Sequence, residues 1–188
     1  MSIDTSLVDT LNRWGEGYGS LVRVFSNDLV YAVILLAALW LLLMILKAHP
    51  IHEGWKNFVK HLIIKGLVIL AIPAGIAISI SESISAIYPR QRPFVADSSV
   101  ELLVPHAADG GMPSNHIIFM VTLVTSIFFY QKGLASVLAA LTLLTGIARV
   151  VAGIHYPSDI LVGAILGVVI VYLYRWFISS TSFSKLLR

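Results

Sequence analysis

The chain has 188 residues, of which 57% are hydrophobic and only 12% charged, and its mean hydropathy is +0.87. Soluble domains contain roughly a quarter charged residues, so this composition excludes an ordinary soluble domain and predicts an integral membrane protein. A net charge of +3 would suggest nucleic acid as the ligand of a soluble protein. Cationic residues also gather at the cytoplasmic ends of spanning helices, and we therefore expect no nucleic-acid partner. The absence of cysteine excludes disulfides and thiolate chemistry.

The first 27 residues combine apolar and charged side chains at helical spacing. Leu7, Leu11, Trp14 and Tyr18 recur every three or four residues, with charged residues between them. This pattern predicts an amphipathic helix that lies in the membrane interface and breaks near residues 15–17, where two glycines flank a glutamate. An ordinary arm flanking the membrane explains the same pattern equally well.

Apolar segments that follow this arm predict spanning helices, each of which needs about 20 mainly apolar residues. The five segments cover residues 28–46, 62–80, 117–130, 134–148 and 160–178. Pro73 should kink the second helix. The expected fold is an all-α integral membrane bundle of about five transmembrane helices plus an N-terminal amphipathic interfacial helix. We expect a single domain over residues 1–188, with an arm at 1–27, a transmembrane bundle at 28–178 and a cytoplasmic tail at 179–188.

The distribution of lysine and arginine predicts the orientation of these helices. The connector 47–61, the turn 131–133 and the tail together carry seven such residues, and we expect this side to be cytoplasmic. The long polar loop 81–113 and the short loop 149–158 then lie on the extracytoplasmic side. Three polar motifs fall in or beside these two loops, although none of them was used to predict the orientation. The coincidence favours one site built from all three.

The middle motif reads Pro113-Ser114-Asn115-His116 and directly precedes an apolar run. This order is typical of a helix start, whose free N–H groups and positive dipole end bind anions such as phosphate. The Ser114 hydroxyl can donate to a phosphate oxygen or simply cap the helix. His116, in the first turn, can protonate a leaving oxygen. The alternative is a capped helix followed by an interfacial histidine.

The last motif contains Arg149, His155 and Asp159. A carboxylate hydrogen-bonded to one imidazole nitrogen fixes the tautomer and stabilises the imidazolium, which leaves the other nitrogen free to attack phosphorus. We therefore assign His155 as a candidate nucleophile and Asp159 as its partner. The alternatives are an arginine that snorkels to the interface and an aspartate that favours the positive end of a helix.

The first motif places Arg90 and Arg92 between prolines, which makes a stiff cationic corner suited to bidentate phosphate binding. Contact between these arginines and lipid headgroups is the alternative. Two histidines and a carboxylate can also bind a metal, but two nearby arginines would repel a cation. We therefore expect no metal and no cofactor. His106 lies on the same side of the membrane, where we expect it to line the mouth of the site, and we assign it no chemical role.

These motifs resemble those of the type-2 phosphatidic-acid phosphatase superfamily: a lysine followed by arginine-proline, then proline-serine-glycine-histidine, then serine-arginine with histidine and aspartate. The segments PRQRPFVADSSVELLVPHAADGGMPSNH and TGIARVVAGIHYPSD are most similar to the bacitracin-resistance type of undecaprenyl-diphosphate phosphatase. The resemblance implies metal-independent phosphate removal through a phosphohistidine. It makes His155 the nucleophile, Asp159 its partner and His116 the acid, with Arg92, Ser114 and Arg149 holding the phosphoryl group.

Three positions depart from the family pattern. Ser85 stands where the family has lysine, Asn115 where it has glycine and Ala148 where it has serine. We expect Arg90 to supply the missing charge, and Asn115 to narrow the pocket or add a hydrogen bond.

The expected function is hydrolysis of undecaprenyl diphosphate to undecaprenyl phosphate and inorganic phosphate at the outer face of a bacterial inner membrane. The expected partners are therefore a polyprenyl diphosphate and membrane lipids, with no oligomeric state assigned. A phosphatase of phosphatidylglycerophosphate or phosphatidic acid, or a lipid A phosphotransferase, would share this site. A non-catalytic lipid-phosphate binder is a further alternative, although binding alone would need only the arginines.

Overall fold

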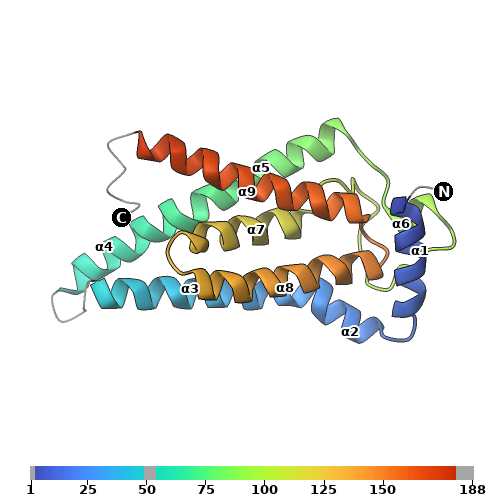
Figure 1. Cartoon of the computed structure of the whole chain (residues 1–188), viewed down its shortest axis with the longest axis horizontal. Helices are drawn as coiled ribbons and strands as arrows, with labels where there is room; N and C mark the ends of the chain where they lie inside the picture. The colour runs from blue at the N-terminus through green and yellow to red at the C-terminus, as the bar shows by residue number, and fades with distance from the viewer. Residues whose placement is uncertain (1–2, 49–53, 181–188) are drawn as a thin grey trace.

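A computed structural model describes residues 3–48 and 54–180 of the chain. The described residues form helices and loops and contain no strand. The long helices lie side by side along the long axis of the molecule, and α1 (Ile3–Gly15) crosses one end of them (Figure 1). This arrangement confirms the predicted all-α membrane bundle with an amphipathic helix at its N-terminus.

Within residues 3–48 and 54–180, four helices are long and apolar enough to cross a membrane. The first runs over Gly19–Ala48 and comprises α2 (Gly19–Arg23), the π-helical turn η1 (Val24–Asp28) and α3 (Leu29–Ala48). The second runs over Trp55–Ile87 and comprises α4 (Trp55–Gly66), the π-helical turn η3 (Leu67–Ala71) and α5 (Ile72–Ile87). The other two are α8 (Lys132–Val151) and α9 (Pro157–Ser179).

The fifth apolar helix, α7 (Asn115–Phe128), is shorter and lies in the centre of the bundle. Its buried face includes Ile118, Met120 and Ile127, and it packs against α5, α8 and α9. At about 1.5 Å per residue it is roughly 21 Å long, which is less than the hydrocarbon core of a bilayer. Its N-terminal end lies short of the ends of α8 and α9, and the loops before it fill that end of the bundle (Figure 1).

Two of the predicted spanning helices had wrong boundaries. The first spanning helix begins at Gly19 rather than residue 28, because η1 joins α2 to α3 without a break. The second begins at Trp55 and extends to Ile87, into the predicted loop 81–113, which also contains the short helix α6 (Pro93–Ala96). Serines allow this extension because the hydroxyls of Ser79 and Ser83 donate to carbonyls four residues earlier within the helix.

One other expectation was confirmed, and part of another lies outside the described residues. α1 ends at Gly15, and Gly17 follows with a positive φ of 86°, as the predicted break requires. The irregular turn η3 ends two residues before Pro73, which has no N–H to donate to the turn before it, and the kink expected there stays a prediction. Of the tail predicted for 179–188, residues 181–188 lie outside the described part of the chain.

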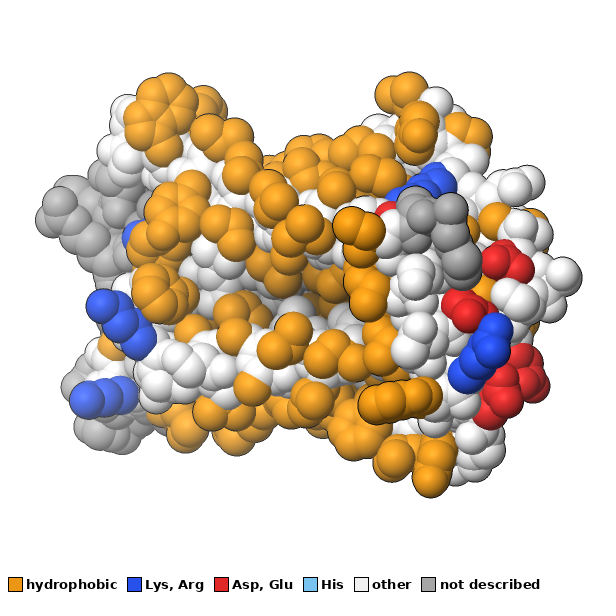
Figure 2. Space-filling model, turned by 45° about the vertical axis from the view of Figure 1, so that its right-hand side comes forward, with side chains coloured by type: hydrophobic (Ala, Val, Ile, Leu, Met, Phe, Trp, Pro, Cys, Tyr) orange, Lys and Arg blue, Asp and Glu red, His pale blue; other side chains and the backbone are white. Residues whose placement is uncertain are grey.

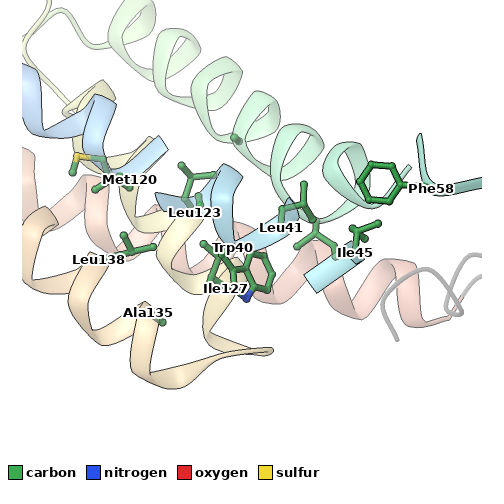
Figure 3. Packing of buried hydrophobic residues seen from close by; sticks show 13 residues of the cluster. Trp40, Leu41, Ile45, Phe58, Met120, Leu123, Ile127, Ala135 and Leu138 are labelled. Carbon is green, nitrogen blue, oxygen red and sulfur yellow. The ribbon is translucent and has the colours of Figure 1, made fainter. Parts of the chain in front are cut away.

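The largest hydrophobic core joins α3, α4, α5, α7 and α8. Figure 3 shows Trp40, Leu41, Met120, Leu123 and Leu138 meeting in this cluster. The outer surface of the bundle is also apolar, with exposed large side chains such as Leu43, Leu144, Leu161 and Trp176, and hydrophobic side chains cover most of the face drawn in Figure 2. Exposed apolar surface of this extent is what contact with lipid requires.

Candidate active site

A cavity of about 380 Å³ lies at the end of the bundle that α1 crosses. It is lined by Glu82, Ser85, Ala86, Arg92, His106, Asp109, Gly110, Pro113, Asn115, His116, Arg149 and His155. The structure thus brings five of the eight predicted site residues to one cavity: Arg92, Asn115, His116, Arg149 and His155. Ser114, Asp159 and Arg90 do not line it.

His155 is buried at the base of this cavity with only 2% of its surface exposed. Its Nδ1 lies 2.8 Å from the carbonyl oxygen of Gly111. Because a carbonyl can only accept, we assign the proton to Nδ1 and a lone pair to Nε2. Burial, followed by the charges of Arg149 and Arg92, holds the pKa of His155 well below its usual 6.5. The side chain is therefore a neutral imidazole whose Nε2 is available to attack an electrophile.

Asp159 lies beside His155 but makes its hydrogen bonds elsewhere. Its Oδ2 is 3.6 Å from His155 Nδ1, beyond a normal hydrogen bond, and instead accepts from the Tyr156 amide at 2.8 Å. This contact is one half of a capping box at the start of α9. The hydrogen-bond partner of Nδ1 in the structure is thus the Gly111 carbonyl, while Asp159 lies within ion-pair distance of the ring. Asp159 is placed to act on His155 through its charge.

Arg90 lies behind the cavity rather than in it. One of its nitrogens donates to Asp159 Oδ1 at 2.7 Å and to Ser158 Oγ at 2.6 Å, and the other donates to Asp4 at 2.9 Å. In the structure Arg90 thus binds Asp159 and does not line the cavity. Ser85, at the position of the family lysine, does line the cavity and carries no charge.

Arg92 is buried and held by the main chain on one side. Its Nη1 donates to the carbonyl of Ile154 at 2.9 Å and lies 3.3 Å from His155 Nε2. Its Nε and Nη2 contact Asp109 Oδ1 at 2.9 and 2.8 Å. The Asp109 side chain is 64% exposed, so an anion entering the cavity can replace it.

Arg149 is buried with 1% of its surface exposed, near the end of α8. Its Nη1 donates to the carbonyl of Ser26 at 3.0 Å and approaches Asn27 Oδ1 at 3.3 Å, while Nη2 lies 3.3 Å from His155 Nε2. Among residues 3–48 and 54–180, no carboxylate lies within ion-pair distance of this guanidinium. A buried charge without a counterion is costly, so the site is built to receive an anion.

The N-terminus of α7 supplies the remaining predicted residues. Ser114 is its N-cap and is fully buried, and within the described part of the chain its hydroxyl has no hydrogen-bond partner. Asn115 accepts from Ser81 and donates to Glu82, so its amide ties a cavity-lining carboxylate to the start of α7. His116 lies in the first turn and faces the cavity.

Sequence reasoning missed several groups that complete the site: Gly111, Asn27, Glu82 and Asp109. His106 lines the cavity, as expected from the sequence, and its Nε2 lies 3.4 Å from Arg149 Nη2. The capping contact from Tyr156 to Asp159 had a signal, because a carboxylate three residues after an N-cap is a known helix-start pattern.

Two buried arginines around a neutral histidine, at the end of a membrane bundle, define a phosphate-handling membrane protein. Residues 63–182 match the model of the PAP2 superfamily. The chain is also 32% identical over 171 residues to undecaprenyl-diphosphatase BcrC of Bacillus subtilis (strain 168), covering 89% of this chain and 76% of that protein. The chain therefore belongs to the PAP2 superfamily, and it is a membrane lipid phosphatase of that family.

Two crystal structures share the fold. Aquifex aeolicus LpxE superimposes with a TM-score of 0.64 at 20% identity, covering 93% of this chain and 95% of that one. The first transmembrane PAP2 type phosphatidylglycerolphosphate phosphatase from Bacillus subtilis gives a TM-score of 0.63 at 15% identity, covering 96% and 87%. At these identities the likeness concerns the fold.

Proposed function

We propose that the protein hydrolyses undecaprenyl diphosphate to undecaprenyl phosphate and inorganic phosphate through a phosphohistidine on His155. The observation that carries this proposal is the Arg149 guanidinium, which is buried, has no carboxylate partner within the described residues and lies 3.3 Å from His155 Nε2. A terminal phosphate in the cavity would supply the missing anion and present its phosphorus to that nitrogen.

The first half-reaction transfers the terminal phosphoryl group to the enzyme. Nε2 of His155 attacks the terminal phosphorus, the bond from that phosphorus to the bridging oxygen breaks, and undecaprenyl phosphate leaves. His116 donates a proton to the bridging oxygen as it departs. Arg92 and Arg149 bind the phosphoryl oxygens, on which negative charge is spread in the transition state.

The second half-reaction releases phosphate and restores the histidine. A water molecule attacks the phosphohistidine phosphorus, gives its proton to His116, and the N–P bond breaks. The Gly111 carbonyl holds Nδ1–H throughout, and the Asp159 carboxylate at 3.6 Å offsets the positive charge that the ring carries while phosphorylated.

An apolar groove supports a lipid substrate with a long tail. It lies between α3, η3, α5 and α7, and small residues such as Ala37, Ala74 and Gly75 form part of its lining. Ser79 of the groove and Glu82 of the cavity follow each other at helical spacing on one face of α5. From Gly66 to Ser79 the groove extends roughly 20 Å along the helix. A lipid can thus lie in the groove with its headgroup at His155.

Phosphate release from undecaprenyl diphosphate by the purified protein in detergent, with excess chelator, tests the proposal beside His155→Ala. Release by the parent alone is expected. Loss of activity on chelation would contradict the metal-independent route. The same panel includes phosphatidylglycerophosphate and phosphatidic acid as substrates, and lipid A as a phosphate acceptor. Faster turnover with any of these lipids would reassign the substrate. Lipid binding without phosphate release would favour a binding protein.

We propose further that the cavity faces the outer side of a bacterial inner membrane. Lys47, Lys56, Lys60 and Lys132 lie at helix ends away from the cavity, and Figure 2 shows basic side chains at one end of the molecule and both acidic and basic side chains at the other. Because the chain has no cysteine, single-cysteine variants test this directly. A membrane-impermeant thiol reagent should label Ser98→Cys in intact spheroplasts and leave Gln131→Cys unlabelled. The reverse pattern would invert the topology.

A further inference from the structure

The helix α1 contacts the start of α9 through one acidic side chain. Asp4, in the first turn of α1, accepts hydrogen bonds from the Ser158 amide at 3.1 Å and from the Ser158 hydroxyl. The same carboxylate forms an ion pair with Arg90 at 2.9 Å. Asp4 and Ser158 are separated by 154 positions in the chain and Asp4 and Arg90 by 86, and none of the three lines the phosphate cavity.

Arg90 in turn connects Asp4 to the catalytic centre. Its guanidinium lies between two carboxylates, Asp4 at 2.9 Å and the fully buried Asp159 at 2.7 Å, and stacks 4.1 Å from the centre of the Tyr156 ring. Asp159 lies 3.6 Å from His155. A continuous series of charged groups therefore runs from α1 through Arg90 and Asp159 to the imidazole.

A second set of contacts fixes α1 against the loop before α7 and the end of α8. The buried Asn12 side chain donates to the carbonyls of Glu101 and Val151 at 2.8 and 2.9 Å and accepts from the Glu101 amide at 2.8 Å. Gly15 lies so close to Val151 that an added Cβ would come within 2.4 Å of its side chain. The helix is thus docked at both its beginning and its end.

We propose that Asp4 is a positioning residue of the active site, so that α1 helps to build the catalytic centre in addition to covering the end of the bundle. Asp4 pairs with one nitrogen of the Arg90 guanidinium. This contact keeps the other nitrogen on Asp159, and it thereby keeps Asp159 beside His155. Without Asp4, Arg90 has a single carboxylate to pair with, and its partly exposed side chain can draw Asp159 away from the Tyr156 amide. The kinetic test of this inference rests on the proposed function. The helix α1 lies outside the residues that match the family model.

Steady-state kinetics of Asp4→Asn provide that test. We expect kcat to fall about tenfold while KM changes little, because a displaced carboxylate weakens the chemical step without touching the substrate. Asp4→Glu, which keeps the carboxylate, should recover most of kcat. Asp9→Asn is the matched control, since Asp9 lies on the same helix and pairs with the exposed Arg13, and it should behave as the parent.

A double-variant comparison separates positioning from general destabilisation. If Asp4 acts through Arg90, adding Asp4→Asn to Arg90→Gln should cause no further loss of kcat. Additive losses would contradict the relay, by which we mean the series of contacts from Asp4 through Arg90 and Asp159 to His155. Should Asp4→Asn not fold, Ser158→Ala removes the hydroxyl that both Asp4 and Arg90 bind, and it should lower kcat in the same direction. Parental kcat in that variant would overturn the proposal.

Amide hydrogen exchange tests the relay without any turnover. The segment 154–159 contains the Tyr156 amide that donates to Asp159. Exchange there should accelerate in Asp4→Asn and in Arg90→Gln, and stay parental in Asp9→Asn. Parental exchange and parental kcat in Asp4→Asn would overturn the inference and leave the phosphatase proposal intact. A parent that releases no phosphate from any lipid would overturn the proposed function, while the exchange result would still decide the relay.

Discussion

The Arg149 guanidinium and the His155 imidazole face each other at 3.3 Å, Nη2 to Nε2, with both side chains buried. An arginine N–H can only donate, so this contact requires a lone pair on Nε2 and therefore a neutral ring. The second nitrogen of Arg149 is held by Ser26 and Asn27. The Arg149 guanidinium thus keeps one terminal nitrogen bonded to the protein and presents the other to the nucleophile and its substrate.

Replacing Arg149 by lysine should lower kcat/KM by roughly a hundredfold or more, because an ammonium retains the charge but cannot contact Asn27 and a phosphate oxygen at the same time. Arg23→Lys, on an exposed face of the first spanning helix, is the control and should keep parental kcat/KM. A parental kcat/KM in Arg149→Lys would show that the site needs only a positive charge at this position.

The acid limb of the pH profile should report the pKa of His155. Burial and the two arginines lower this pKa, so the neutral nucleophile persists below pH 6.5 and kcat/KM should hold through that range before it falls. Arg92→Gln removes a positive neighbour and should move the acid limb to higher pH, in addition to lowering the rate. An acid limb that stays in place in Arg92→Gln would assign it to another group.

Truncation of Asn115 should weaken substrate binding more than catalysis. The Asn115 amide holds Glu82, which lines the cavity, so Asn115→Ala frees a carboxylate that can compete for the arginines. We expect KM to rise severalfold with kcat little changed, and Glu82→Gln should restore KM in that background. Failure of this rescue would mean that Asn115 binds substrate directly.

Asp109 should act as an internal competitor of the substrate. Its exposed carboxylate pairs with Arg92, and a phosphate must replace it. Asp109→Asn should therefore lower KM severalfold, while stability changes by less than about 1 kcal/mol, as for other exposed ion pairs. Asp97→Asn removes a carboxylate that binds Ser99 in the same loop and should leave KM unchanged. A raised KM in Asp109→Asn would assign Asp109 to substrate binding instead.

A bulkier residue in the groove should discriminate between long and short lipids. An added Cβ at Gly75 meets no atom within 4 Å, so Gly75→Leu adds its side chain at an open position in the groove. KM for undecaprenyl diphosphate should rise severalfold, while kcat/KM for a short-chain prenyl diphosphate stays near that of the parent. Gly133→Leu, equally unhindered and outside the groove, is the control. Equal effects on both chain lengths would exclude this groove as the tail site.

The polar motifs could be brought together from sequence because each borders an apolar run. The distribution of lysine and arginine then placed Arg92, His116, Arg149 and His155 on one side of the membrane. Other features had no such signal. The Gly111 carbonyl that binds His155 is a backbone group, and no side chain marks its position. Asn27 reaches Arg149 across 122 residues of sequence. The helix through Ser83 was read as a loop because serine bonding back to its own helix resembles, in composition, a polar connector.

The pairing of Asp4 with Arg90 shows a further limit of sequence reasoning. Two arginines two residues apart, Arg90 and Arg92, looked equivalent as phosphate ligands. The structure separates them, because Arg92 lines the cavity while Arg90 binds two carboxylates and does not line it. An aspartate at the beginning of an amphipathic helix carried no indication of this contact.

Trapping the phosphorylated enzyme tests the central claim most directly. The parent would be mixed with undecaprenyl diphosphate, quenched in alkali, where phosphohistidine survives, and examined by peptide mass spectrometry. We expect one phosphate on the peptide that contains His155, and none in His155→Ala. Phosphate on a different residue, or phosphate release by His155→Ala at the parental rate, would contradict His155 as the nucleophile.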